Sequence, residues 1–403
     1  MTPIPQGRKN EPAKDAKTLN IRVVNNLEEL EHLRPDWEEL LSQYPQSSIF
    51  STWEWLAPWW RAYGVDQQLC VLAFYDDSHR LVGLAPLSIS VLMSWGKHWK
   101  VLRLMGDGSG DSDNLDLPVV PDYEDAVLRL MLNFLDTHSA LWDFCELNTL
   151  PSNSSVVKPL VPLLKDYGYF CVDVQMPCSC VCLSNSWEDY LRQLPSRVRT
   201  QYRSLRRRFE ARPETRVYRC SQQADLAPSL EALFNLHQKH WVSKGQTGSF
   251  AIEARRKFYL DLSEGLLRRN WLEFWFLETN GNVIAADYGF RYGDTDYSLQ
   301  AGFDPANAAE RPGFWLKCCM LKALIESGVH RYDFLGGYSK GKARWNAQLS
   351  NYVGIHFARS WSAGAAYLRL RDDSKHSKEW LRTHLPPPAW RVLHGFNTAI
   401  HGN

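Results

Sequence analysis

The sequence has no excess of charge of either sign, since 46 Lys and Arg balance 45 Asp and Glu among 403 residues, a formal net charge of +1. This balance argues against a globally basic, DNA-binding protein and against an acidic tail protein. Long apolar runs are also absent: the longest, residues 81–95, contains Pro86 and falls short of the roughly 20 residues that span a bilayer. Residues 1–17 show no apolar signal segment. We therefore expect a cytoplasmic protein with no membrane span and no DNA partner.

Several catalytic and metal-binding motifs are missing. The nine cysteines predict reduced thiols, and the three that alternate over residues 178–182 predict strand packing, because no second ligand pair completes a zinc site. No Glu lies between His237 and His240, as a His-Glu-x-x-His metal site would need. Gly336–Lys342 nearly matches a P-loop, but Ala343 stands where Ser or Thr must reach magnesium. We therefore expect no metal site and no nucleotide hydrolysis.

The composition itself is that of an ordinary folded protein, with 44% hydrophobic and 23% charged residues. At roughly 100–200 residues per domain, the length predicts two domains. The 17 tryptophans predict an aromatic cleft as well as a core. We predict a flexible leader at residues 1–19, an N-terminal domain at 20–180, a C-terminal domain at 186–360 and a peripheral tail at 361–403.

Hydrophobic periodicity predicts that both domains mix helices and strands. In the first, strands are expected over residues 21–24, 69–75, 81–90, 100–105, 142–147 and 169–174, and helices over 27–41 (split at Pro35), 51–63, 123–137 and 156–167. In the second, helices are expected over 187–194, 197–211 (capped by Ser196), 226–242, 252–267 and 314–327, and strands over 271–278, 283–291, 295–303, 331–335 and 352–358.

The segment Arg311–Phe314 opens a long predicted helix directly after a strand and a loop. The first N–H groups of a helix and its dipole attract anions. Gly313 lets a ligand approach the backbone, Pro312 stiffens the entry, and Arg311 adds a charged donor. The alternative is an ordinary loop with a Pro-Gly stop.

A glycine-rich loop follows the predicted strand that ends near Asp333. It presents Lys342 and Arg344 beside this buried aspartate. Such an arrangement suits an anionic or carbonyl group, and the alternative is a solvated basic loop.

Six arginines fall between residues 197 and 208. Arg199, Arg203 and Arg206 share one helical face, at i, i+4 and i+7. This face suits a phosphate, a polyanion or RNA. The alternative is a solvated helix that is paired to acidic neighbours.

Taken together, residues 187–359 resemble the CelD-like (cellulose-biosynthesis-associated) acetyltransferases of the GNAT superfamily, which are similar to the Fem aminoacyl ligases. Residues 21–175 look like the divergent first half of a tandem arrangement. The shared features are the helix Arg197–Arg208, Leu236–His237 with Trp241, the strand end Ala301–Phe303, Pro312–Gly313, and Asp333–Phe334 followed by Lys342-x-Arg344–Trp345.

The resemblance implies an α/β (α+β) protein of tandem GNAT-like domains, each with a twisted, mostly antiparallel sheet flanked by helices. It also implies transfer of an acetyl or other acyl group from acyl-CoA to an amine or hydroxyl, with a sugar or exopolysaccharide precursor as one acceptor class. Two alternatives remain open. One is a catalytically silent GNAT-fold module that binds a polysaccharide-assembly partner or a polyanion. The other is a Fem-like transferase that uses aminoacyl-tRNA, against which the near-neutral charge argues.

Within this layout, Asp287 shares a strand face with the small and apolar Val283, Ala285 and Gly289. A carboxylate there should have a raised pKa, which suits a general base. The alternative is a surface aspartate. The expected site comprises catalytic Asp287 and Lys342, the acetyl-CoA-binding Arg311, Gly313 and Phe314, and the acceptor-binding Arg203, His240, Trp241, Gln300, Asp333 and Arg344. Lys342 is expected to bind the acceptor's anionic group.

Overall fold

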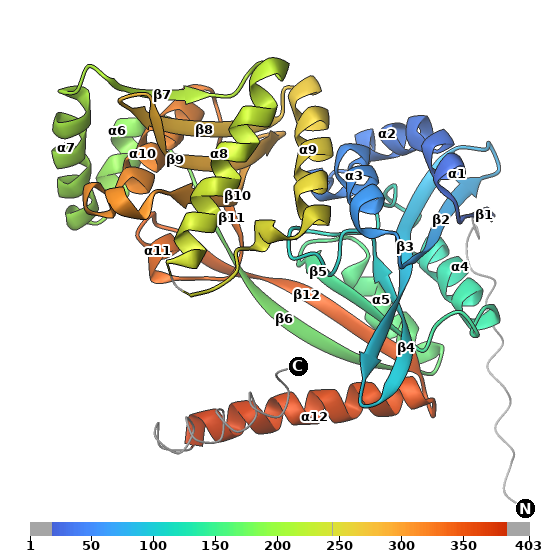
Figure 1. The fold of residues 1–403 in the computed structure, drawn as a ribbon. Coiled ribbons are helices and arrows are strands. Elements are labelled where there is room, and N and C mark those ends of the chain that lie inside the picture. The colour runs from blue at the N-terminus through green and yellow to red at the C-terminus, as the bar shows by residue number, and fades with distance from the viewer. Residues whose placement is uncertain (1–17, 244, 385–403) are drawn as a thin grey trace, which may run out of the picture.

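The computed structural model describes residues 18–243 and 245–384 (Figure 1). The first half contains β1 (Leu19–Val24), α1 (Leu27–His32), α2 (Arg34–Ser42), α3 (Trp53–Tyr63), β2 (Gln68–Asp76), β3 (Leu81–Ser94), β4 (Lys97–Leu104), α4 (Glu124–Thr137), β5 (Phe144–Pro151), α5 (Val157–Asp166) and β6 (Tyr169–Cys182). The second half contains α6 (Trp187–Gln193), α7 (Ser196–Glu210), β7 (Thr215–Arg219), α8 (Gln223–Val242), α9 (Glu253–Arg268), β8 (Leu272–Thr279), β9 (Asn282–Tyr292), β10 (Thr295–Phe303), the 3-10 helix η3 (Pro305–Glu310), α10 (Pro312–Glu326), β11 (Arg331–Gly336), α11 (Lys340–Ala343) and β12 (Gln348–Arg359), and α12 (Ala363–His384) follows.

The described strands form one twelve-stranded sheet in the order β1-β2-β3-β4-β5-β12-β6-β11-β10-β9-β8-β7. The β4–β5 and β10–β11 pairs are parallel, and the other neighbours are antiparallel. The two halves therefore repeat one strand order, and each gives its last strand to the other. Figure 1 shows the exchanged strands β6 and β12 side by side between the halves.

The predicted fold class is confirmed: a mixed α/β protein with a large, twisted, mostly antiparallel sheet flanked by helices. Several local expectations need correction. The first helix breaks at Leu33, and Pro35 lies in the first turn of α2, where its missing N–H costs no hydrogen bond. Ser196 is the first residue of α7, whose N-cap is Pro195. The short edge strand β7 was not expected, because its arginines obscure any alternation of apolar and polar residues.

The two halves share a hydrophobic core. Trp55 on α3 packs edge-to-face on Phe258 of α9 and on Phe290 of β9, with ring centroids 5.5 and 5.1 Å apart. Phe50 contacts the rings of Phe290 and Tyr297. The tryptophan-rich helix of the first half is therefore core, and it supports the strands that shape the site below.

The predicted peripheral tail begins with α12, whose first turns lie against the sheet. Tyr367 stacks on Phe144 of β5 and contacts Trp99 of β4. Residues 1–17 and 385–403 of the predicted leader and tail lie outside the described residues. Among the helices described, none combines the length and apolar character needed to cross a membrane.

Candidate functional site

The sheet opens between β10 and β11. These parallel strands pair at three positions, the last joining Tyr297 to Asp333. Beyond Tyr297, β10 continues to Phe303 but is paired in the sheet only with β9, while β11 remains paired with β6 on its other edge. A bulge between Ser298 and Gln300 further disturbs the ladder. The open edge of β10 can therefore bond an extended ligand as a strand would.

A cavity of about 560 Å³ lies at this opening, and we call it the α10 cavity. It collects side chains from β9, β10, the start of α10 and the segment around α11. Six predicted site residues line it: Asp287, Arg311, Gly313, Phe314, Lys342 and Arg344. Residues that were not predicted also line it, including Gln201, Ser298 and Lys317.

The N-terminus of α10 lies at the α10 cavity. Its N-cap, Arg311, has a left-handed backbone, with φ 55° and ψ 50°. The N–H groups of Phe314 and Trp315 both donate to the Arg311 carbonyl. Within the described part of the chain, the Gly313 N–H has no hydrogen-bond partner, and a Cβ built on Gly313 would meet only Phe303, at 3.7 Å. This end of the helix therefore offers a backbone donor and space to an anion.

The first half provides an internal comparison. By strand order, α4 is the counterpart of α10. Its first turn carries Glu124 and Asp125, whereas the first turn of α10 has no acidic residue. The α4 carboxylates oppose a bound anion, so of these two helix starts only that of α10 suits one.

Two arginines accompany this helix start. Burial lowers the pKa of Arg344, and the charge of Arg311 lowers it further. Among the described residues, neither arginine has a carboxylate within 4.0 Å. The Arg344 Nε donates to the Gly341 carbonyl, and its guanidinium lies 5.6 Å from the ring centre of Phe314. Two like charges held close without a carboxylate favour an anion between them.

A buried ion pair forms one wall of the α10 cavity. The Lys317 Nζ lies 2.7 Å from Asp287 Oδ2, and it also donates to Ser298 Oγ and to the Tyr332 hydroxyl. Among the described residues Asp287 Oδ1 has no partner. Burial raises the pKa of Asp287, and Lys317 acts in the opposite direction. Lys317 was not predicted from the sequence. It could have been noticed because it is the single lysine in the otherwise apolar first turns of α10.

The Lys342 side chain stabilises the turn between β11 and α11 through hydrogen bonds to backbone carbonyls. Its Nζ donates to the carbonyls of Phe334 (2.8 Å), Leu335 (3.4 Å), Gly336 (2.6 Å) and Gly337 (3.1 Å). Burial lowers the pKa of Lys342, while Asp113 and Asp333 raise it. The ammonium therefore organises this turn as well as lining the α10 cavity.

Asp333 has a second carboxylate beside it. Asp113, from the loop after β4, accepts a hydrogen bond of 2.9 Å from the Gly336 N–H, and Asp333 accepts one of 2.8 Å from the Leu335 N–H. Burial raises the pKa of both carboxyl groups, and the charge of Asp333 raises the pKa of Asp113 further, whereas Arg331, 3.5 Å from Asp333, lowers the pKa of Asp333. Because Tyr332 and Phe334 face α10, Asp333 faces the other side of the sheet. The first half thus supplies a residue that sequence reasoning missed.

The remaining predicted residues lie away from the α10 cavity. Arg203 is exposed on α7. The His240 ring packs near Phe303, and the Trp241 Nε1 donates to His237 Nε2 at 2.9 Å. Gln300 follows the β10 bulge. The described lining of the α10 cavity does not include Arg203, His240, Trp241, Gln300 or Asp333.

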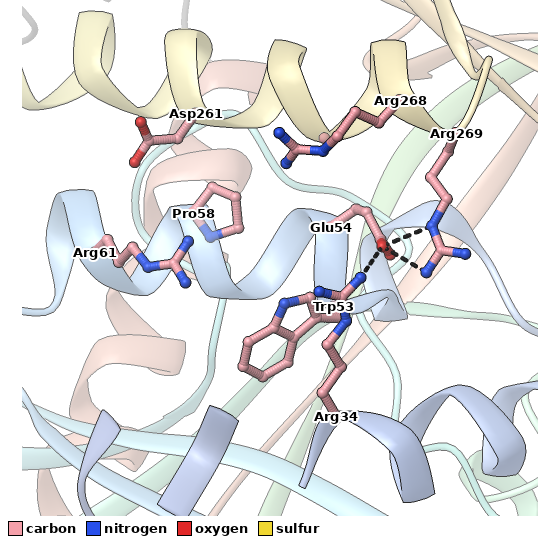
Figure 2. A pocket seen from close by; sticks show the side chains of 9 residues that line it. Arg34, Trp53, Glu54, Pro58, Arg61, Asp261, Arg268 and Arg269 are labelled. Atoms are coloured by element: carbon pink, nitrogen blue, oxygen red, sulfur yellow. Dashed lines mark hydrogen bonds and ion pairs between the residues drawn. The ribbon is translucent and has the colours of Figure 1, made fainter. Parts of the chain in front are cut away.

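A further cavity of about 450 Å³ lies between α3 and α9 (Figure 2). The buried Glu54 carboxylate accepts hydrogen bonds from Arg34 at 3.1 Å and from Arg269 at 2.8 Å. Arg61 and Arg268 also line this cavity. The Glu54 bonds join the helices of the two halves, and we assign this cavity a structural role.

The strand predicted around the three alternating cysteines is present as the end of β6. Cys178, Cys180 and Cys182 all lie on β6, and the nine cysteines are free thiols. Within residues 18–243 and 245–384, no group of three or more His, Cys, Asp or Glu side chains could hold a metal ion.

Comparisons with known proteins agree with this fold. Residues 196–345 match the family described as "Acetyltransferase (GNAT) domain". The crystal structure of FemX is similar, with a TM-score of 0.59, 11% identity, and coverage of 84% of this chain and 98% of that chain. A conserved protein of unknown function from Bacteroides thetaiotaomicron VPI-5482 has a TM-score of 0.53, 13% identity, and coverage of 85% and 100%. A search of curated proteins found no match. The second half therefore carries a GNAT-type acyltransferase fold.

Proposed function

We propose that this protein is an acyltransferase that moves an acetyl or other acyl group from acyl-CoA to an amine or hydroxyl acceptor. One observation carries the proposal: the open edge of β10 leads to a helix start whose Gly313 N–H and two arginines have, among the residues that the structure describes, no hydrogen-bond or carboxylate partner, respectively. The corresponding helix of the first half differs, because α4 begins with carboxylates. The acetyltransferase match covers the half that keeps it.

The residues present fit an acyl-CoA. Gly313 and the α10 N-terminus would hold its pyrophosphate, with Arg311 and Arg344 balancing the charge. The open β10 edge would bond the amides of its extended arm. When bound, acyl-CoA supplies a thioester carbonyl, and unpaired β10 N–H groups are suitable donors to its oxygen.

The acceptor would bind on the opposite side of the sheet, near Asp333 and Asp113. Two neighbouring carboxylates suit an amine or a group rich in hydroxyls, such as a sugar. A sugar or exopolysaccharide precursor remains our proposed acceptor class. The proton-acceptor role predicted for Asp287 remains a prediction.

Acetyl-CoA binding is the direct test. A ligand at 100 times its Kd adds about 2.7 kcal/mol to the free energy of unfolding, which differential scanning calorimetry resolves. Absence of a shift at millimolar acetyl-CoA, together with a shift on aminoacyl-tRNA, would favour the Fem-like alternative. Absence of both shifts would favour the silent binding module.

Lys342→Met should destabilise the protein by about 1–3 kcal/mol, because it leaves carbonyls of the β11–α11 turn without their donor. We expect KM for the acceptor to rise with kcat nearly unchanged, since the turn positions the acceptor side. Urea unfolding and steady-state kinetics measure both effects. Lys340→Met, on the same turn but exposed, is the control and should change stability by less than about 0.5 kcal/mol. A fall in kcat of about 100-fold at constant KM would instead assign Lys342 to transition-state stabilisation.

A further inference from the structure

A second hollow continues from the α10 cavity along α7, and we call it the α7 groove. It measures about 440 Å³ and shares Gln201 and Arg311 with the α10 cavity. The groove is lined by Ser196, Arg197, Thr200, Gln201, Ser204, Leu205, Arg208, Ala309 and Arg311. The lining contains three arginines and three hydroxyls but no carboxylate.

Five of the six arginines of α7 fall into two groups, and the sixth, Arg203, is exposed. In one group, Arg199 donates to the Leu194 carbonyl, Arg206 pairs with Glu210, and Arg207 donates to the Arg203 carbonyl. In the other, Arg197 and Arg208 line the α7 groove, and neither has a carboxylate within 4.0 Å among the described residues. The side chains of the first group bond to residues of α7 or of the segment just before it, whereas those of the second group are available to a ligand.

The groove residues of α7 follow a helical period. Arg197, Thr200, Ser204 and Arg208 are spaced by three or four residues and therefore share one face. The nearby Glu310 already accepts hydrogen bonds of 2.7 and 3.2 Å from Arg212. Arg212 is therefore its hydrogen-bonded partner, while Arg208 acts on Glu310 only through a weaker charge interaction, so the groove lining keeps a net positive charge.

We propose that the α7 groove binds a second phosphate group of the acyl donor, the 3′-phosphate on the ribose of CoA. This inference rests on the proposed function. If the α10 N-terminus holds the pyrophosphate, Arg311 lies between the two sites and faces both anions. Arg197 and Arg208 offer forked donors that match phosphate oxygens, and Thr200 and Ser204 add hydroxyl donors. The cations converge on a hollow that continues the donor cavity, an arrangement that favours a small phosphorylated ligand over an extended RNA backbone.

The test compares CoA with 3′-dephospho-CoA, which differ by this phosphate alone. We expect the parent to bind CoA roughly tenfold tighter, as a charge-assisted contact provides. The double variant Arg197→Gln/Arg208→Gln should lose that preference and bind 3′-dephospho-CoA as the parent does. Arg207→Gln, on the same helix but outside the groove lining, should keep the preference. Isothermal titration calorimetry measures the affinities of the three proteins for both ligands.

Several results would overturn the inference. If the double variant keeps the parent's preference for CoA, the 3′-phosphate binds elsewhere, although the proposed function stands. If it loses affinity for both ligands equally, the arginines act on a group that both share. If it loses only tRNA binding, the groove is an RNA contact. If the parent binds neither CoA nor 3′-dephospho-CoA, the proposed function fails as well.

Discussion

Gly313→Val should weaken acetyl-CoA binding by about 10- to 100-fold while leaving the fold intact. The added side chain would block the approach of the pyrophosphate to the Gly313 N–H. Losing a hydrogen bond to a charged group costs about 1.5–3 kcal/mol. Folding should tolerate the change, because a Cβ at Gly313 meets only Phe303, at ordinary contact distance. Isothermal titration calorimetry gives the affinity, and urea unfolding gives the stability.

Gly313→Ala separates these two effects. Alanine in a helix stabilises by up to about 1 kcal/mol relative to glycine, so this variant should be at least as stable as the parent. It should still bind acetyl-CoA less tightly, since even one methyl group crowds the approach to the N–H. Parent-like affinity in both variants would place the anion site elsewhere and would contradict the assignment of α10.

Lys317→Met should have the largest effect on stability, a loss of about 3–5 kcal/mol. It would leave the Asp287 carboxylate buried without its counter-charge, and breaking a buried pair from one side is strongly destabilising. Lys317 and Asp287 have side-chain exposures of 10% and 3%, so little water solvates the carboxylate even though both residues line the α10 cavity. Urea unfolding measures the difference.

Lys322→Met is the matched control on the same helix. Its side chain is 47% exposed and lies 3.8 Å from Glu326, so its loss should cost less than about 1 kcal/mol. The double variant Lys317→Met/Asp287→Asn removes both charges and should regain part of the stability. Equal losses in Lys317→Met and Lys322→Met would show that the buried pair contributes nothing beyond a surface charge.

The local features of the site could be predicted from the sequence, because they depend on neighbours along the chain. The Pro312–Gly313 pair follows a strand and opens a periodic apolar helix, and this order is enough to place a helix start there. The alternation on β9 placed Asp287 on the same face as Ala285, but an irregularity between Val283 and Ala285 puts Val283 against the other core cluster, which the alternation did not predict. The hairpins of β8, β9 and β10 follow from turn residues such as Asn280–Gly281.

Contacts between distant segments were decided only by the tertiary structure. Periodicity tells which face of an element is buried, but it does not identify the partner. The exchange of β6 and β12 depends on which strand edges are free after both halves have folded. The same limit hid Asp113, which reaches Gly336 across 223 residues, and Lys317, whose partner lies on another element.

The arginines of α7 show the same division. Their clustering is evident from residues 197–208, and the helical period indicates several shared faces. Sequence reasoning chose the face of Arg199, Arg203 and Arg206, whereas the groove uses Arg197 and Arg208. A charged helix can turn any polar face to solvent at similar free energy, so the packing of Tyr202, Leu205 and Phe209 sets its rotation. That packing, which arises only in the folded chain, determines which arginines lie beside the candidate donor site.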